Sequence, residues 1–216
     1  MTLDSFNHVN TINDPKILAV IDRLNRNRAF PSADTSPETM ANAPENFTDC
    51  GFSIHPTQGE LIYLLCRSLR ATRVVDFATS IGMSALYFAA AMKDNGHGKV
   101  IGAELVPEKA AIAQRHLAEA GLSDYADIRV GDARETLRDL GGDVDFALID
   151  GWPSTRGVSL ARDVIEVVAP QLRVGGMVLN DNAEPDFLDY LRDPNNGFIS
   201  VSLPIKGSTE LALKIR

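Results

Sequence analysis

The chain has 216 residues, of which 44% are hydrophobic and 23% charged, a composition typical of a soluble globular protein with one domain. Its formal net charge of −8 argues against a duplex nucleic-acid partner, which favours a basic surface. Cys50 and Cys66 have no ligand-like spacing, and the sequence contains no signal-peptide pattern and no apolar run long enough to cross a bilayer. We therefore expect a reduced, cytoplasmic protein without a membrane partner.

The first part of the chain predicts two helices separated by an irregular segment. Pro15 starts a short amphipathic pattern whose apolar positions are Ile17, Leu18, Ile21 and Leu24. Residues 29–55 contain three prolines and show no periodicity, which indicates either a linker or a cover over a site. Thr57 and Glu60 then have the spacing of a capping box before a second apolar helix.

From residue 73 onward, apolar runs alternate with helical patterns. The apolar runs lie at 73–77, 99–103, 126–130, 144–149 and 176–180. The helical patterns lie at about 83–93, 107–120, 133–140, 157–169 and 185–192. Such alternation predicts right-handed crossovers and a parallel sheet that is covered on both faces.

The end of the chain departs from this alternation. The strand-like runs "FISVSLP" and "STELALKI" are separated only by "IKG", too short for a crossover helix, so they predict an antiparallel hairpin. The expected fold is α/β: a doubly wound, mostly parallel, seven-stranded sheet with helices on both faces and a C-terminal antiparallel hairpin. We assign this domain to residues 56–216, preceded by an N-terminal helix and cover segment in residues 1–55.

Ligands of open parallel sheets bind beyond the carboxyl ends of the strands, and in this sequence every such end carries an acidic residue. These residues are Asp76, Glu104, Asp132, Asp150 and Asp181. This acidity disfavours a pyrophosphate and suits a ligand with hydroxyls, an amine and a positive centre. S-adenosylmethionine has these groups and no phosphate. Ala78 can therefore replace the first glycine of a dinucleotide turn, while Gly82 and Ser84 open the helix that would receive the ligand's carboxylate.

Two neighbouring strands end in oxygen-bearing side chains. Asp150 follows the fourth strand, and Asp181 and Asn182 follow the fifth. Carboxylate and amide oxygens suit Mg²⁺ or another hard divalent cation rather than Zn²⁺. Such an ion would stabilise a phenolate and orient it. The alternative is that Asp181 and Asn182 cap the following helix.

Several segments resemble the class I S-adenosylmethionine-dependent methyltransferases, and in particular the catechol and caffeoyl-CoA O-methyltransferase group. They include "VVDFATSIGMSALYFA", "VIGAELVPEKAAIAQRHLAEAG", "GDARETL", "DVDFALIDGW", "LRVGGMVLNDN" and "LPIKGSTELALKI", and they occur in the expected order over roughly residues 50–216. The resemblance implies the Rossmann-like methyltransferase fold and, together with the apolar N-terminal helix, a homodimer. It also implies that the cofactor is bound by Asp76, Ala78, Gly82, Ser84, Glu104, Asp132, Ala133 and Trp152, and the metal by Asp150, Asp181 and Asn182.

The sequence departs from the resembled family after the first metal ligand. The family has a lysine, taken to help deprotonate the hydroxyl, where this chain has Pro153, and a tyrosine where it has Arg156. Either the metal acidifies the hydroxyl with help from Arg156 or an ordered water, or the acceptor is not a catechol. Asp150 and Arg156 are the candidate catalytic residues.

The sequence thus predicts a metal-assisted O-methyltransferase that acts on a small, hydroxylated, catechol-like acceptor. Three alternatives stay open: a methyltransferase of the same fold acting on a modified tRNA base, a Rossmann-type oxidoreductase, and a cofactor-binding protein without catalysis. The missing glycines and the closing hairpin disfavour the oxidoreductase. Phe30, Phe47 and Phe52 of the cover segment either line an aromatic acceptor site or pack against the core.

Overall fold

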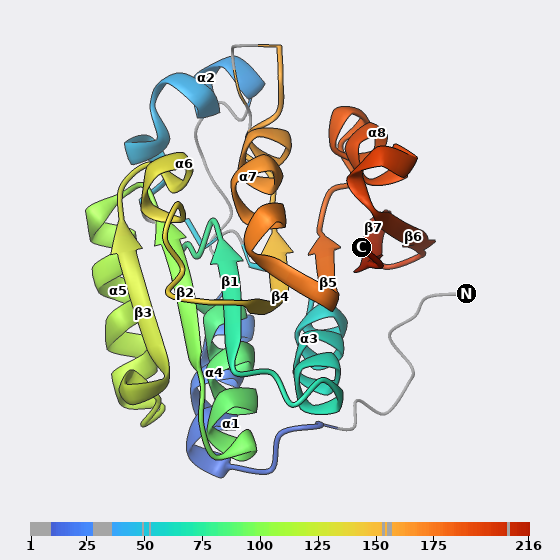
Figure 1. Cartoon of the computed structure of the whole chain (residues 1–216). Helices are drawn as coiled ribbons and strands as arrows, with labels where there is room; N and C mark the ends of the chain where they lie inside the picture. Colours follow the sequence, from blue (N-terminus) through green and yellow to red (C-terminus); the bar gives the residue numbers. More distant parts are fainter. Residues whose placement is uncertain are drawn as a thin grey trace.

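The computed structural model describes residues 10–27, 36–48, 50–51, 53–152, 154, 157–206 and 208–216. They form a sheet with the strand order β3-β2-β1-β4-β5-β7-β6 (Figure 1). The strands are β1 (Arg73–Phe77), β2 (Lys99–Glu104), β3 (Ala126–Val130), β4 (Val144–Ile149), β5 (Leu172–Asn180), β6 (Phe198–Leu203) and β7 (Thr209–Lys214). Neighbours among β1 to β5 are parallel, whereas β7 runs antiparallel to both β5 and β6. The predicted mostly parallel seven-stranded sheet with a C-terminal hairpin is confirmed.

Helices cover both faces of the sheet, as predicted. One hydrophobic core lies under α1 (Pro15–Arg26), α3 (Pro56–Ser68), α4 (Met83–Asn95) and α5 (Pro107–Glu119). The other lies under α6 (Ala133–Thr136), α7 (Leu160–Val168) and α8 (Pro185–Arg192). Alternate strand residues point to opposite faces, so Val74 joins the first core and Val75 the second. Short 3₁₀ turns complete the chain at η2 (Pro44–Phe47), η3 (Ser123–Tyr125), η4 (Ala169–Gln171) and η5 (Pro194–Asn196).

Helix α1 packs against its own chain. The Asp14 side chain accepts a hydrogen bond from the backbone N–H of Lys16 and caps the helix. The apolar residues Ile17, Val20, Ile21 and Leu24 are buried in the core shared with α4 and α5. Because this apolar face is covered within the chain, it gives no argument for a homodimer, which stays a prediction from the resemblance alone. The boundary between residues 1–55 and 56–216 likewise stays a prediction.

The segment that shows no periodicity in the sequence contains short helices. Helix α2 (Pro37–Asn42) is capped by the Ser36 hydroxyl, and η2 follows it directly. Two prolines at helix starts explain this, because proline fixes φ near its helical value and needs no N–H partner there. Phe30 and Phe52 lie outside the described residues.

Some predicted boundaries were wrong. The N-cap of α3 is His55, whose backbone N–H donates to Gln58 Oε1 at 2.8 Å, so the predicted capping box of Thr57 and Glu60 does not form. Glu60 instead accepts from the backbone N–H of Thr11 at 2.7 Å. Helix α6 ends at Thr136 rather than near residue 140, and β5 begins four residues before its predicted start. Within the described residues, no helix is long and apolar enough to cross a membrane.

Candidate active site

The turn between β1 and α4 bends over the end of β2. The backbone N–H groups of Ala78 and Thr79 both donate to the carbonyl oxygen of Ala103, at 3.1 and 3.2 Å. Ala78 and Ser80 have left-handed backbones, with φ of 63° and 52°. Gly82, the N-cap of α4, has φ of 91°, and a Cβ there would lie 3.1 Å from the Cα of Ala113. The glycine is therefore required by its conformation and by the close approach of α5.

Glu104, at the end of β2, is buried and held by backbone donors. The N–H of Ser80 donates to Oε2 at 2.7 Å, and the N–H of Val106 donates to Oε1 at 2.9 Å. Each oxygen keeps a further lone pair that could accept from a ligand hydroxyl. The carboxylate is thus held in one orientation by the turn and by its own loop.

Asp76, on β1, is fully buried and only partly satisfied. The Ser84 hydroxyl donates to Oδ2 at 3.0 Å, whereas Oδ1 has no partner among the described residues. Burial raises the pKa of Asp76 to about 7, opposed by the Ser84 and Thr79 hydrogen bonds and assisted by the Glu104 charge. A cationic donor on a ligand would satisfy Oδ1 and favour the ionised form.

A cavity of about 250 Å³ opens at the carboxyl ends of β1, β2 and β3. Most of its lining is apolar: Ala41, Pro44, Phe77, Ala78, Ala103, Leu105, Ala133, Trp152, Leu160 and Val164, with Gly131, Asp132, Arg134 and Ser154. Asp132 caps α6 and binds the Arg134 side chain, with Nε 2.9 Å from Oδ1. The sequence-predicted Ala78, Asp132, Ala133 and Trp152 therefore lie around one cavity, slightly below the size typical of small-molecule sites.

Trp152 is covered by the N-terminal segment. Its indole Nε1–H donates to the carbonyl oxygen of Met40 at 3.0 Å, and its ring meets Phe47 edge-on with centroids 6.0 Å apart. The Lys109 ammonium lies 5.7 Å from the Trp152 ring centroid. Phe47 is fully buried in this contact, which favours the packing interpretation of that phenylalanine over an acceptor-lining one.

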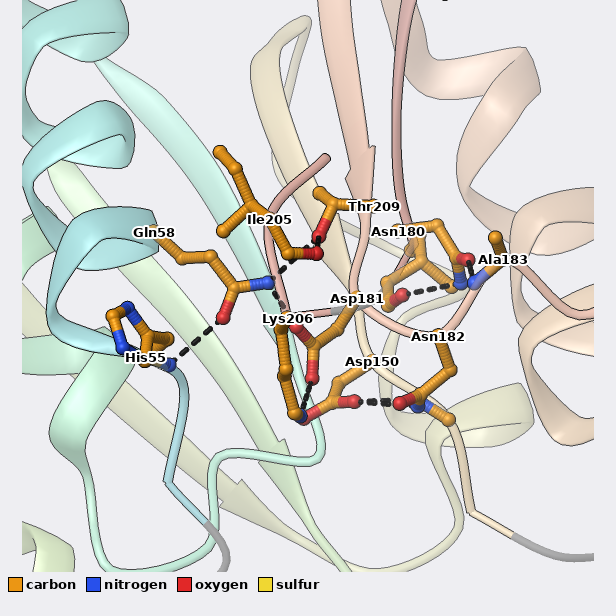
Figure 2. A network of polar contacts seen from close by, with 12 residues as sticks. His55, Gln58, Asp150, Asn180, Asp181, Asn182, Ala183, Ile205, Lys206 and Thr209 are labelled. Carbon is orange, nitrogen blue, oxygen red and sulfur yellow. Dashed lines mark hydrogen bonds and ion pairs between the residues drawn. The ribbon is translucent and has the colours of Figure 1, made fainter. Parts of the chain in front are cut away.

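Asp150, Asp181 and Asn182 come together at the ends of β4 and β5, and we call them the acidic centre (Figure 2). Asn182 Nδ2 donates to Asp150 Oδ1 at 3.1 Å. Asp181 is fully buried, and its two oxygens accept from Gln58 Nε2 and Lys206 Nζ. Helix α8 is capped at Glu184 without a side-chain hydrogen bond, so the alternative in which Asp181 and Asn182 cap this helix is wrong.

The two carboxylates of the acidic centre interact strongly. Burial raises the pKa of Asp150 to about 8, with a further contribution from the Asp181 charge and an opposing one from Lys206. Gln58 and Lys206 were not predicted from the sequence. Gln58 occupies the third position of α3, where a glutamine accepts from the N-cap backbone, and it also bridges to Thr209 Oγ1 at 3.0 Å (Figure 2).

The donor chemistry of the acidic centre fits a hard divalent ion. Two carboxylates and an amide supply oxygen ligands of the kind that Mg²⁺ prefers. In the part of the chain that the structure describes, no three His, Cys, Asp or Glu side chains gather at a metal-binding distance. A divalent ion here would therefore need Asn182, with its amide turned to present oxygen, as the third protein ligand.

A second cavity, of about 630 Å³, lies beside the acidic centre. Its lining consists of Gly151, Trp152, Ser154, Gly157, Val158, Ser159, Asn182, Glu184, Pro185 and Asp186. Trp152 and Ser154 line both cavities, so the two spaces adjoin. Pro153 and the predicted catalytic Arg156 lie outside the described residues.

The fold and the strand-end site define a class of ligand-binding α/β proteins, and comparisons with known proteins narrow it. A family profile described as "Methyltransferase domain" matches residues 77–183. The catechol O-methyltransferase of Niastella koreensis is 31% identical over 141 residues, which cover 61% of this chain and 63% of that relative, less than two thirds of its length. A Mycolicibacterium vanbaalenii protein assigned to the O-methyltransferases is 30% identical over 163 residues, covering 71% of both chains.

Solved structures share the fold. The O-methyltransferase from Bacillus cereus in complex with SAH superimposes with a TM-score of 0.65 at 18% identity, covering 91% of this chain and 97% of the other. TomG from Streptomyces achromogenes, solved with SAM, gives a TM-score of 0.63 at 21% identity, with 92% and 96% coverage. The sheet is thus that of the Rossmann-like methyltransferase fold. The chain belongs to the O-methyltransferase family, as the relative that is 30% identical over 71% of both chains shows.

Proposed function

We propose that this protein transfers the methyl group of S-adenosylmethionine to a hydroxyl oxygen of a small, catechol-like acceptor, assisted by a divalent cation. The observation that carries the proposal is the pair of adjoining cavities that share Trp152 and Ser154. One is mostly apolar and lies where the fold binds nucleotide-like ligands, and the other borders the acidic centre through Asn182. A donor and an acceptor bound in these two spaces would meet beside Trp152.

The cofactor would lie along the ends of β1, β2 and β3. Glu104, held by the Ser80 and Val106 N–H groups, would accept from the ribose hydroxyls. The unpartnered Oδ1 of Asp76 would accept from the methionine ammonium, while Ser84 and the start of α4 at Gly82 would receive the carboxylate. Ala78, Asp132, Ala133 and Trp152 would enclose the adenine.

The acceptor would bind at the other cavity. Its oxygen would attack the methyl carbon in line with the carbon–sulfur bond, whose electron pair stays on sulfur, while the hydroxyl proton passes to water. Catalysis would come mainly from positioning and from stabilising the oxyanion. Asp150, Asp181 and Asn182 would hold the divalent ion, which when bound would stabilise a phenolate and orient it. Arg156 stays a candidate assistant, and homodimerisation stays part of the proposal.

The test is binding followed by product detection. Calorimetry with S-adenosylhomocysteine should give saturable binding, and Glu104→Gln should weaken it by about 10-fold to 100-fold, because the ribose hydroxyls would lose a charged acceptor. Glu108→Gln, on the exposed start of α5, is the matched control. No binding by the wild type overturns the proposal.

Mass spectrometry then identifies the acceptor class. Incubation with S-adenosylmethionine and a panel of catechols should yield a product heavier by one CH₂, formed faster with Mg²⁺ than with a chelator. Methyl incorporation into tRNA in place of the catechols would overturn the small-acceptor proposal. Cofactor binding without a product from either substrate class would support the non-catalytic alternative and count against methyl transfer.

A further inference from the structure

Lys206 places a positive charge at the acidic centre from a separate part of the chain. It lies in the turn between β6 and β7, and its Nζ forms an ion pair with Oδ2 of Asp181 (Figure 2). The Lys206 side chain is 42% exposed, whereas the Asp181 side chain is 0% exposed. The lysine therefore reaches inward from the surface to a carboxylate that has no contact with solvent.

Asp181 is fully engaged by these contacts. Its Oδ1 accepts from Gln58 Nε2, which also contacts Thr209, and its Oδ2 faces the ammonium group. Gln58 carries no charge, so it cannot neutralise Asp181. Within the described ranges, Lys206 is the basic side chain that forms an ion pair with this aspartate. A buried carboxylate is strongly destabilising when its charged partner is removed, so this contact matters to the folded state.

A divalent ion at the acidic centre would need the position beside Asp181 that the Lys206 ammonium group occupies. A metal ion bound by Asp150, Asp181 and Asn182 would use carboxylate lone pairs of Asp181, one of whose oxygens faces the Lys206 ammonium. Two cations on one carboxylate repel each other strongly away from water. Because the Lys206 side chain is partly exposed, its ammonium group has solvent into which it can move.

We propose that Lys206 is a built-in counter-ion of the acidic centre, and that a divalent ion binds there only by displacing its ammonium group from Asp181. The inference rests on the proposed function in taking Asp150, Asp181 and Asn182 as the cation ligands. Its consequence is that Lys206 sets the metal affinity: the protein keeps Asp181 paired with an ammonium group without metal and takes up a divalent ion weakly.

The experiment measures Mg²⁺ binding by calorimetry on metal-free protein, without cofactor or acceptor. Lys206→Met, which keeps the length of the side chain without its charge, should bind Mg²⁺ at least about 10-fold more tightly than the wild type. Lys206→Arg should stay close to the wild type. Lys99→Met removes a charge from an exposed residue at the opposite end of the sheet and controls for the change in net charge. Equal affinities of Lys206→Met and wild type, or no Mg²⁺ uptake by either, would overturn the proposal.

Thermal unfolding supplies a second readout. In a chelator, Lys206→Met should melt at a lower temperature than the wild type, because Asp181 has lost its counter-ion. Excess Mg²⁺ should remove this difference in melting temperature. Lys99→Met should show neither effect. In an Asp181→Asn background, Lys206→Met should change Mg²⁺ affinity by less than about twofold, since the displaced contact is absent. An equally large change in that background would refute the role of Asp181.

Titration of S-adenosylhomocysteine into the same preparations separates the two proposals. A Mg²⁺ response of Lys206→Met without any cofactor binding would refute the methyl-transfer function and retain the counter-ion. Normal cofactor binding with no Mg²⁺ response would refute the counter-ion alone.

Discussion

The cofactor corner, meaning the end of β1, the turn at residues 78–82 and Glu104, differs from the acidic centre in how its carboxylates are satisfied. Glu104 accepts from the backbone N–H groups of Ser80 and Val106, which no side-chain substitution removes directly. Asp181 accepts from the side chains of Gln58 and Lys206, which lie 123 and 25 positions away in the sequence. Glu104 is thus held by backbone groups of the β1–α4 turn and of its own loop, whereas Asp181 depends on side chains from two other segments packing against it.

The largest effect that would test this comparison is the pH dependence of stability caused by Asp76. Its folded-state pKa of about 7 lies above the unfolded value near 3.8, so the folded state holds its proton more tightly. The corresponding stability is fully present below about pH 4 and is lost as the pH rises to about 7, a total of about 4 kcal/mol. Asp76→Asn, which cannot ionise, should remove this loss. Denaturant unfolding of both proteins from pH 4 to pH 8 measures the difference.

The control for that experiment is Asp124→Asn, at an exposed position before β3. It should leave the stability curve parallel to that of the wild type. If the Asp76→Asn curve is also parallel to that of the wild type, then the pKa of Asp76 is not raised in the folded protein.

The corresponding perturbation of the acidic centre is Gln58→Glu. The new carboxylate can still accept from the His55 backbone N–H, but it replaces the donor that faces Asp181 and Thr209. Two buried like charges would then lie in contact, and we expect the free energy of unfolding at pH 8 to fall by about 3 kcal/mol. Lowering the pH or adding Mg²⁺ should recover part of the loss, because either one neutralises the added charge.

Gln114→Glu, on the exposed face of α5, adds the same charge away from any site and should change stability by less than about 0.5 kcal/mol. A Gln58→Glu protein as stable as this control at pH 8 would contradict the described contact between Gln58 and Asp181. Urea unfolding at pH 6 and pH 8, with and without Mg²⁺, provides the measurement.

The same difference explains what the sequence could predict. The alternation of strands and helices and the acids at strand ends follow from local patterns, so the sheet with its closing hairpin and the grouping of Asp150, Asp181 and Asn182 were found. Gln58 and Lys206 were missed because a glutamine in a helix and a lysine in a turn are common surface residues. Only the packing of α3 and of the β6–β7 turn against β5 brings them to Asp181.

The errors in the predicted helices have causes in the nearby sequence. The helices at 37–42 and 44–47 are too short for periodicity to reveal, although a proline marks each start. Helix α6 ends at its C-cap Leu137, and Gly141 and Gly142, both with positive φ, lie in the turn before β4. The roles of the cofactor-binding residues, of the metal ligands and of Arg156 stay predictions, because no contact with a ligand tests them.

The smallest expected effect concerns the strained turn of the cofactor corner. Ala78 has φ of 63°, a conformation that costs an alanine about 1 kcal/mol and a glycine nothing in steric terms. Ala78→Gly should therefore raise the free energy of unfolding by up to about 0.5 kcal/mol, since glycine's greater freedom in the unfolded chain offsets part of the relief. Ala118→Gly, at an exposed position in the last turn of α5, should instead lower it, by less than about 1 kcal/mol.

Cofactor affinity decides whether this strain is useful. Strained backbones persist where the surrounding structure holds them, often at ligand sites. If Ala78 restricts the turn to the shape that the cofactor needs, Ala78→Gly should be slightly more stable and yet bind S-adenosylhomocysteine about twofold to fivefold more weakly, because the freer turn must be ordered on binding. Unchanged affinity with higher stability would mean that the left-handed alanine is only tolerated. A loss of stability equal to that of Ala118→Gly would mean that the turn is not strained at Ala78. In either case, the backbone N–H groups that donate to Glu104 would account for the shape of the cofactor corner without a contribution from strain at Ala78.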